Sequence, residues 1–320
     1  MFHFLFPEKL MSRRVIAVVI AALAVSFSSG LYGQAGQAFQ FVVSALDDKG
    51  EPLTDIKAEE VLFAEKAGKG TVSKIEPFSL PVKVTIAVDN GDQSSEALPH
   101  YRAGLKGFVE AFPDGTEFTL LTTSPQPRMV VRPTTDRAAV LRGVNGFAPE
   151  MERPRFTDAM VEYSQRLQKE AKDPKVKLYV PILLMVSTAS NESSSYQPAE
   201  VQKALEFMVA RRVKLYVTIN STRSGDATAT ADLNTNRQAI IAVPATKALN
   251  GRFESIAIFN RLQTLLPEMG QELASYAKRL GTQHQVTVQR AAAGPMEELR
   301  IELARQGAKG SVSVDGYFPK

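Results

Sequence analysis

Along residues 38–81 apolar and polar positions alternate, and from residue 82 onward short apolar strands alternate with helical patterns. Every second position from Phe39 to Ala45 is apolar, which predicts a β-strand with one buried face. The segment Asp47–Gly50 follows as a turn, because Gly can adopt the positive φ that a tight turn needs. The first part of the chain is therefore predicted to be rich in β-structure.

The pattern changes at Val82. Val82–Val88 alternates like a strand, and Tyr101–Phe112 carries apolar residues at the spacing of one helix face. Val176–Val186 is almost continuously apolar, which is typical of a strand buried on both faces of a parallel sheet. We predict an α/β fold with a doubly wound, mostly parallel sheet, a small N-terminal β segment and a C-terminal extension of helices and strands.

Polarity also predicts where the parts of the chain begin and end. Asn220–Arg237 contains almost no large apolar residues and is predicted to be a loop. Leu262–Leu280 repeats apolar residues every three or four positions, and Pro267 favours two helices or one kinked helix. The predicted organisation is a signal peptide at 1–35, a β segment at 38–80, the α/β domain at 81–220, a polar loop or insert at 221–250, and the C-terminal extension at 251–320.

The beginning of the chain has the pattern of a secretory signal. Arg13 and Arg14 precede Val15–Phe27, an uncharged apolar run of thirteen residues. A membrane-spanning helix needs roughly 20 apolar residues, so the run is interpreted as the core of a signal peptide. Cleavage is expected near Gly33 or Ala35, and an uncleaved anchor is the alternative. We expect a secreted or periplasmic protein with no membrane span after cleavage; both Met1 and Met11 fit as the start.

Composition excludes several classes of protein. The chain has a formal net charge of +4 and contains no Cys. Nucleic-acid binding usually needs a clustered basic face, and Arg211–Arg212 is interpreted as an ordinary helix end. Without Cys there is no thiol nucleophile and no lipid-modified Cys, so a lipoprotein is excluded.

No catalytic motif is present in the sequence. It lacks Gly-x-Ser-x-Gly, His-Glu-x-x-His and a glycine-rich phosphate loop. Its three His residues, His3, His100 and His284, show no partner spacing that would predict general acid–base chemistry. We therefore expect a protein that is not an enzyme and uses no cofactor.

The order of several short motifs resembles a bacterial, acidobacterial-type family of exported proteins, the VWFA-related domain proteins. The resemblance covers roughly residues 38–320. It implies a von Willebrand factor A-like, Rossmann-type sheet. The segments that carry it are VVSALDDKGEPLTDIKAEEVLF, IEPFSLPVKVTIAVD, FTDAM at Phe156–Met160, LYVPILLMVSTAS and the closing VSVDGYFPK.

The same resemblance implies a degenerate metal-ion-dependent adhesion site. In the family pattern Asp-x-Ser-x-Ser follows the first strand of the domain, and here these positions read Asp89, Gly91 and Gln93. The later Thr ligand falls on Pro154 and the last Asp on Thr188. One of five ligand positions is retained, whereas hard cations need several oxygen ligands. The sequence therefore predicts no bound metal.

A shifted metal site remains the alternative, built from Asp89, Asp92 and Ser94. The main prediction is a metal-independent binding surface at the carboxyl ends of the strands, where ligands of doubly wound sheets bind. The residues predicted to form this surface are Asp89, Gly91, Asp92, Ser94, Ser95, Arg155, Thr157, Thr188 and Tyr196.

The function predicted from the sequence is a non-catalytic interaction or adhesion module of the cell envelope with a protein partner. Two alternatives stay open at this point. The first is a metal-dependent adhesin that uses the shifted acidic site with Mg²⁺ or Ca²⁺. The second is a structural envelope subunit that docks through its C-terminal helices around Leu262–Leu280.

Overall fold

A computed structural model describes residues 38–223, 226–230, 236–293 and 295–317. The described residues belong to one compact unit, Gly36–Lys320. The predicted signal peptide at 1–35 lies outside the described residues. Within the described residues no helix is both long and apolar enough to cross a membrane.

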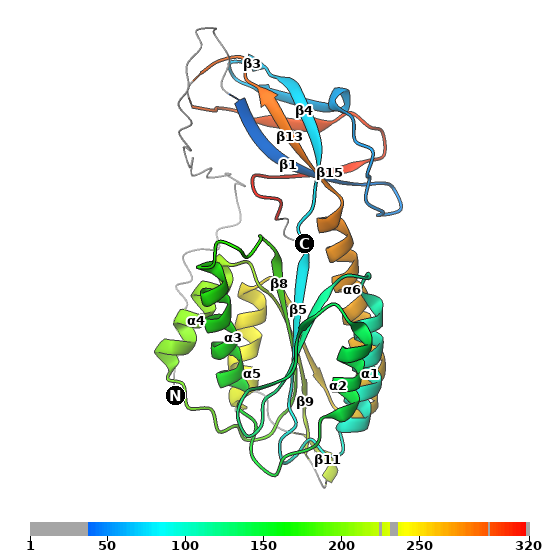
Figure 1. The fold of residues 1–320 in the computed structure, drawn as a ribbon, viewed down its shortest axis with the longest axis vertical. Coiled ribbons are helices and arrows are strands. Elements are labelled where there is room, and N and C mark those ends of the chain that lie inside the picture. The colour runs from blue at the N-terminus through cyan, green and yellow to red at the C-terminus, as the bar shows by residue number, and fades with distance from the viewer. Residues whose placement is uncertain (1–37, 224–225, 231–235, 294, 318–320) are drawn as a thin grey trace. The chain divides into compact units, whose positions relative to one another are not determined.

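A six-stranded sheet forms the centre of the α/β domain (Figure 1). The strands lie in the order β12-β9-β8-β5-β6-β7, and all neighbours are parallel except the edge strand β7. The first strand of the sheet along the chain is β5, which lies in its middle. β6 and β7 follow on one side of β5, and the chain then crosses to β8 on the other side. This arrangement is the predicted doubly wound, mostly parallel sheet. Its strands are β5 (Val82–Val88), β6 (Glu117–Thr122), β7 (Arg128–Thr134), β8 (Val180–Thr188), β9 (Lys214–Asn220) and β12 (Arg252–Ile256).

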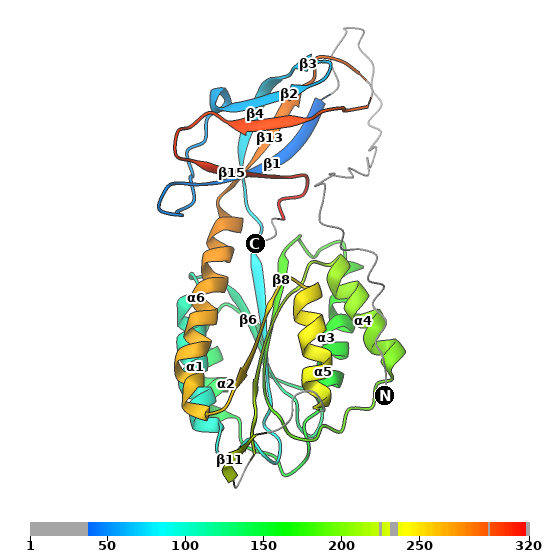
Figure 2. The same cartoon turned by 180° about the vertical axis from the view of Figure 1, so that it is seen from behind.

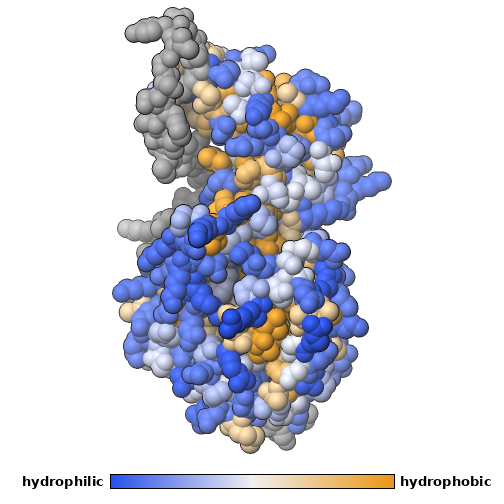
Figure 3. All heavy atoms as spheres, in the orientation of Figure 1, coloured by the Kyte–Doolittle hydropathy of each residue, from blue (hydrophilic) through white to orange (hydrophobic). Residues whose placement is uncertain are grey.

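Helices cover both faces of the sheet, as the views from the front and from behind show (Figures 1 and 2). One face is covered by α1 (Leu98–Ala111), α2 (Arg137–Gly146) and α6 (Leu262–Gly281). The other face is covered by α3 (Phe156–Ala171), α4 (Pro198–Ala210) and α5 (Arg237–Ala248). Hydrophilic side chains cover most of the visible surface, and apolar atoms gather in small patches (Figure 3). This is the surface expected of amphipathic helices whose apolar sides face the sheet.

Small residues allow α1 and α6 to approach each other closely. A Cβ at Gly104 would lie 2.3 Å from the carbonyl oxygen of Leu262, and one at Gly107 would lie 2.6 Å from the ring of Pro267. Pro267 therefore sits inside a single helix, because Gly107 leaves space for its ring. The sequence favours two helices or one kinked helix, and of these the structure has a single helix, Leu262–Gly281, with Pro267 inside it.

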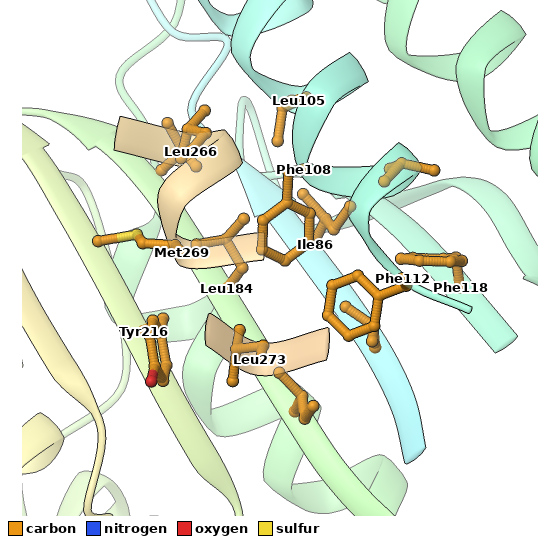
Figure 4. Packing of buried hydrophobic residues seen from close by; sticks show 14 of the residues in the cluster. Ile86, Leu105, Phe108, Phe112, Phe118, Leu184, Tyr216, Leu266, Met269 and Leu273 are labelled. Carbon is orange, nitrogen blue, oxygen red and sulfur yellow. The ribbon is translucent and has the colours of Figure 1, made fainter. Parts of the chain in front are cut away.

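The apolar side of α6 is covered. Its side chains, among them Leu266, Met269 and Leu273, pack with Phe108 of α1 and Ile86 of β5 (Figure 4). Leu262, Leu265, Leu266, Met269 and Leu273 are each at most 1% exposed. The apolar stripe from which docking through the C-terminal helices was predicted therefore faces the core.

The first and last segments of the described chain build a β sandwich together. One sheet has the order β15-β1-β13-β4 and the other β14-β2-β3. Phe41 and Phe63, from opposite sheets, lie with ring centroids 6.2 Å apart in the shared core. The strands are β1 (Ala38–Leu46), β2 (Val61–Glu65), β3 (Gly68–Lys69), β4 (Thr71–Phe78), β13 (Gln283–Gln289), β14 (Arg300–Leu303) and β15 (Lys309–Ser313).

The structure changes the predicted boundaries in two places. The stretch 221–250 was predicted to be a polar loop or insert, which is wrong for residues 237–248, because they form α5. Ala239, Ala242 and Ala245 are buried against the sheet, so a helix with small apolar residues covers this face. Arg252–Ile256, predicted to belong to the extension, is β12 and completes the sheet. The short remaining elements are η2 (Ala58–Glu60), η3 (Phe259–Arg261), β10 (Thr222–Arg223) and β11 (Asp226–Thr230).

Candidate functional site

Four loops meet where the parallel strands end, at the lower end of the α/β domain in Figure 1. We call this region the carboxyl edge. Parallel strands bring their carboxyl ends to one side of a sheet, so residues far apart in sequence become neighbours there. The carboxyl edge comprises the loops at Asp89–Ala97, Thr123–Pro127, Ala148–Arg155 and Ala189–Gln197.

Asp89 is the centre of the buried part of the carboxyl edge and is 1% exposed. Its Oδ1 accepts a hydrogen bond from the backbone N–H of Gly91 at 2.8 Å. Its Oδ2 accepts from Thr188, through the backbone N–H at 3.0 Å and the hydroxyl at 2.6 Å, and from the Ser187 hydroxyl at 3.2 Å. Burial raises the pKa of Asp89, and these hydrogen bonds oppose the rise.

The protein itself fills the space beside Asp89 where further ligands are expected. A Cβ at Gly91 would lie 2.8 Å from Cδ of Pro154 and 2.9 Å from the carbonyl oxygen of Glu152. The backbone at Gly91, a position of a family Ser ligand, thus packs on Pro154, the position of the Thr ligand. Thr188, at the last Asp position, donates to Asp89. These residues do not fit a divalent cation, because Gly91 and Pro154 carry no ligand oxygen on their side chains and pack directly on each other.

The shifted acidic site has no better geometry. Asp92 is exposed, whereas Asp89 is buried, and the Ser94 hydroxyl donates to the carbonyl oxygen of Gly91 at 2.7 Å. The backbone N–H of Asp92 donates to the carbonyl oxygen of Glu152 at 3.0 Å. Among the described residues no group of three or more His, Cys, Asp or Glu is arranged to hold a metal ion.

A second buried carboxylate, Glu192, joins its loop of the carboxyl edge to the start of α3. Its Oε1 accepts from the Thr157 hydroxyl at 2.6 Å, and its Oε2 accepts from the Thr157 backbone N–H at 3.0 Å and from the Ser194 hydroxyl at 3.0 Å. Arg237, at the start of α5, forms an ion pair with Glu192 at 3.2 Å. Thr157 was predicted as a binding residue, and its hydroxyl is used inside the fold.

Asp158 organises the remaining predicted residues. Its carboxylate accepts from the backbone N–H groups of Ser195 at 2.9 Å and Tyr196 at 3.1 Å, and from the Arg155 guanidinium at 3.2 Å. The Tyr196 hydroxyl accepts from the Gln165 side chain at 3.2 Å. Arg155 and Tyr196 are therefore held by the fold, while Asp92 and Ser95 are exposed on it.

The structure thus brings Asp89, Gly91, Ser94 and Thr188 together in one network. Arg155, Thr157 and Tyr196 lie around the carboxylates of Asp158 and Glu192. Sequence reasoning missed Glu192, because a Glu within the polar run Asn191–Ser195 looks like an ordinary solvated loop residue. The polarity of that run was its only signal.

The two histidines within the described residues lie in different parts of the molecule. His100 Nδ1 is 2.9 Å from the Gln263 side chain on the α1–α6 side, and His284 Nε2 is 3.2 Å from the carbonyl oxygen of Thr54 in the β sandwich. Within the described residues, neither histidine forms a hydrogen bond with a carboxylate of the carboxyl edge.

Comparison with known proteins finds similarity only among solved structures. No family model and no curated protein matches the chain. A von Willebrand factor type A protein from Catenulispora acidiphila aligns with a TM-score of 0.47 and 11% identity, covering 88% of this chain and 75% of that chain. BatB, a conserved hypothetical protein from Bacteroides thetaiotaomicron, aligns with a TM-score of 0.43 and 12% identity over 60% of this chain and 98% of that chain.

An aerotolerance-related membrane protein from Bacteroides fragilis aligns with a TM-score of 0.42 and 11% identity, covering 60% of this chain and 99% of that chain. These are proteins to which the chain is similar in fold. The fold itself rests on the order of strands in the sheet, with the chain entering at β5 and the antiparallel β7 at one edge.

Proposed function

We propose that this chain is a non-catalytic protein-interaction module that binds a partner protein through its carboxyl edge without a divalent cation. One observation carries the proposal. Gly91 and Pro154 pack against each other at two positions where the family pattern places metal ligands. Contact between the loops takes over the role of a shared cation in holding them together.

The hydrogen bonds of the carboxyl edge support this reading. Asp89, Asp158 and Glu192 each accept at least three hydrogen bonds from neighbouring loops or strand ends. A surface whose loops are fixed before binding loses little conformational entropy when a partner docks. The loops also lie at the carboxyl ends of the strands, the usual binding side of a doubly wound sheet.

A place in the cell envelope and a role in adhesion belong to the same proposal. They rest on Arg13, Arg14 and the apolar run Val15–Phe27, which predict export. The two alternatives receive less support. The metal-dependent adhesin lacks a convergent ligand set at Asp89, and the docking subunit lacks an uncovered apolar stripe on α6.

Capture of partners from an envelope extract tests the proposal. The mature protein, residues 36–320, would be immobilised in buffer with EDTA and, separately, with millimolar Mg²⁺. A blocked variant would carry Ser95→Arg and Ser193→Arg, two exposed positions on different loops of the carboxyl edge. Ser275→Arg on the exposed side of α6 is the matched control, because it adds the same side chain elsewhere.

We expect a protein to be retained equally in EDTA and Mg²⁺, lost with the blocked variant, and kept with Ser275→Arg. Retention only in Mg²⁺ would replace the proposal by the metal-dependent adhesin. Retention that the blocked variant does not weaken would move the binding surface away from the carboxyl edge.

A further inference from the structure

Met151 is the most exposed large apolar side chain among the described residues, at 90% exposure. The next is Ile258 at 59%. Met151 lies in the carboxyl-edge loop Ala148–Arg155, between Pro149 and Pro154. An isolated exposed apolar residue needs no explanation by itself. Met151 combines its exposure with a backbone that hydrogen bonds fix on both sides of it.

The Met151 loop is hydrogen-bonded to other loops of the carboxyl edge on both sides of Met151. The backbone N–H of Glu150 donates to the carbonyl oxygen of Asn90 at 2.7 Å. The carbonyl oxygen of Glu152 accepts from the Asp92 N–H at 3.0 Å and the Ser124 hydroxyl at 2.8 Å. These bonds fix the two neighbours of Met151 in the chain, so its side chain starts from a fixed backbone.

The bonds continue on the C-terminal side of the loop. The carbonyl oxygen of Pro154 accepts from the Ser193 N–H at 3.0 Å, and the Arg155 N–H donates to the carbonyl oxygen of Thr123 at 3.0 Å. Pro149 and Pro154 restrict the backbone further by fixing their own φ angles. A flexible, polarizable thioether on a rigid loop suits an apolar socket, because only the side chain must be ordered on binding.

Carboxylates outnumber cations around Met151. Asp92, Glu96, Glu150 and Glu152 lie on its loop or on the loop bonded to it, against the guanidinium groups of Arg128, Arg153 and Arg155, of which Arg155 is paired with Asp158. Arg128 is paired with Glu150 at 3.5 Å. Within the described part of the chain no cation lies within ion-pairing distance of Asp92, Glu96 or Glu152. The rim around Met151 thus complements a positively charged partner.

We infer that Met151 is the apolar anchor of the carboxyl edge and that it docks onto a basic protein segment carrying an aliphatic or aromatic side chain. This inference rests on the proposed function and names the chemistry of the partner. The apolar contact supplies binding energy at the centre, and the carboxylate rim selects a partner with Lys or Arg around that contact.

A displayed library of random peptides tests the inference with a defined probe. The mature protein would be panned in EDTA, and selected peptides would be measured against wild type, Met151→Asp, Met151→Leu and Leu178→Asp. Leu178 is 48% exposed at the opposite end of β8, so Leu178→Asp controls for a charge added to an exposed apolar site. Thermal unfolding of each variant verifies that it is folded.

We expect enrichment of peptides that combine Lys or Arg with one aliphatic or aromatic residue. Their Kd should rise about tenfold or more with Met151→Asp, as for a central anchor, and stay within about twofold with Met151→Leu and Leu178→Asp. Enrichment of acidic or neutral peptides, absence of enrichment, or equal binding by Met151→Asp would overturn the inference.

Two further outcomes separate the inference from the proposed function. If the envelope partner is lost with Ser95→Arg and Ser193→Arg but kept with Met151→Asp, the interaction surface stands and the anchor is wrong. If wild type self-associates in sedimentation velocity and Met151→Asp is monomeric, the anchor binds a second copy, and the assignment to a separate basic partner is overturned.

Discussion

Two buried carboxylates, one in the β sandwich and one at the carboxyl edge, are accommodated in different ways. Glu65 receives the Arg290 guanidinium, with Nη2 to Oε2 at 2.7 Å, and both side chains are at most 5% exposed. Within the described residues Asp89 has no such cation, and its hydrogen-bond donors are the neutral groups of Gly91, Ser187 and Thr188. The described residues thus supply a counter-ion for Glu65, whereas Asp89 receives only neutral dipoles.

The two carboxylates also connect different parts of the chain. In the sandwich, Arg290 directly follows β13 and Glu65 ends β2, so their ion pair connects the last and first parts of the described chain. At the carboxyl edge, Asp89 accepts from backbone and hydroxyl donors that tie its own loop to the end of β8. Burial removes water from the Asp89 carboxylate and disfavours its charged form. Because no cation among the described residues offsets this effect, the pKa of Asp89 is raised.

The largest effect is expected from breaking the pair in the sandwich. Arg290→Met leaves Glu65 buried without a counter-ion, so the free energy of unfolding should fall by about 3–5 kcal/mol. Chemical denaturation monitored by circular dichroism measures the loss. Arg261→Met is the control, because its pair with Glu268 is exposed and should contribute at most about 1 kcal/mol. Equal losses in both variants would show that burial does not distinguish the two pairs.

A smaller effect is expected from reopening the space beside Asp89. Gly91→Ser places a Cβ within 3.0 Å of Pro154 and Glu152, so unfolding free energy should fall by about 1–3 kcal/mol. Adding Pro154→Thr removes the ring that the new side chain meets and should recover part of the loss. A Gly91→Ser variant as stable as wild type would mean that the loops are not closed as described.

The smallest effect concerns the ionisation of Asp89. Its folded pKa lies above its ordinary value, so its contribution to stability is fully present below about pH 4 and is lost as the pH rises through the folded pKa. Asp89→Asn cannot ionise, and its amide NH₂ faces donors, which costs about 1 kcal/mol. The difference in unfolding free energy between wild type and Asp89→Asn should therefore shrink as the pH rises from 4 to 7. A difference that grows over this range would contradict the raised pKa.

Much of the α/β domain could be predicted from the sequence because its strands carry strong local patterns. Val82–Val88 alternates and Val176–Val186 is nearly all apolar, and these stretches contain β5 and the first part of β8. The β sandwich could be predicted only as separate pieces, because β1 pairs with β13 across more than 240 residues of sequence. The helix α5 was missed because its small apolar residues and Pro244 resemble a loop.

The candidate site was predictable in outline and not in its contacts. The position of Asp89 at a strand end placed it at the carboxyl edge, and the resemblance pointed to Thr188 as a neighbour. Closure of the loops could not be predicted, since the contact between Gly91 and Pro154 joins positions more than 60 residues apart. Met151 had a weak signal, a lone apolar residue in the charged, proline-rich stretch Ala148–Arg155.

The most direct test of the central claim is thermal unfolding of residues 36–320, first with EDTA and then with millimolar Mg²⁺, Mn²⁺ or Ca²⁺. A cation that binds only the folded state stabilises it by about 2.7 kcal/mol at a hundredfold excess over its Kd. This stabilisation raises the midpoint temperature of unfolding. The closed loops around Asp89 predict the same midpoint in all four conditions. A rise of several degrees that Asp89→Ala abolishes would show that the carboxyl edge holds a cation and would contradict the account.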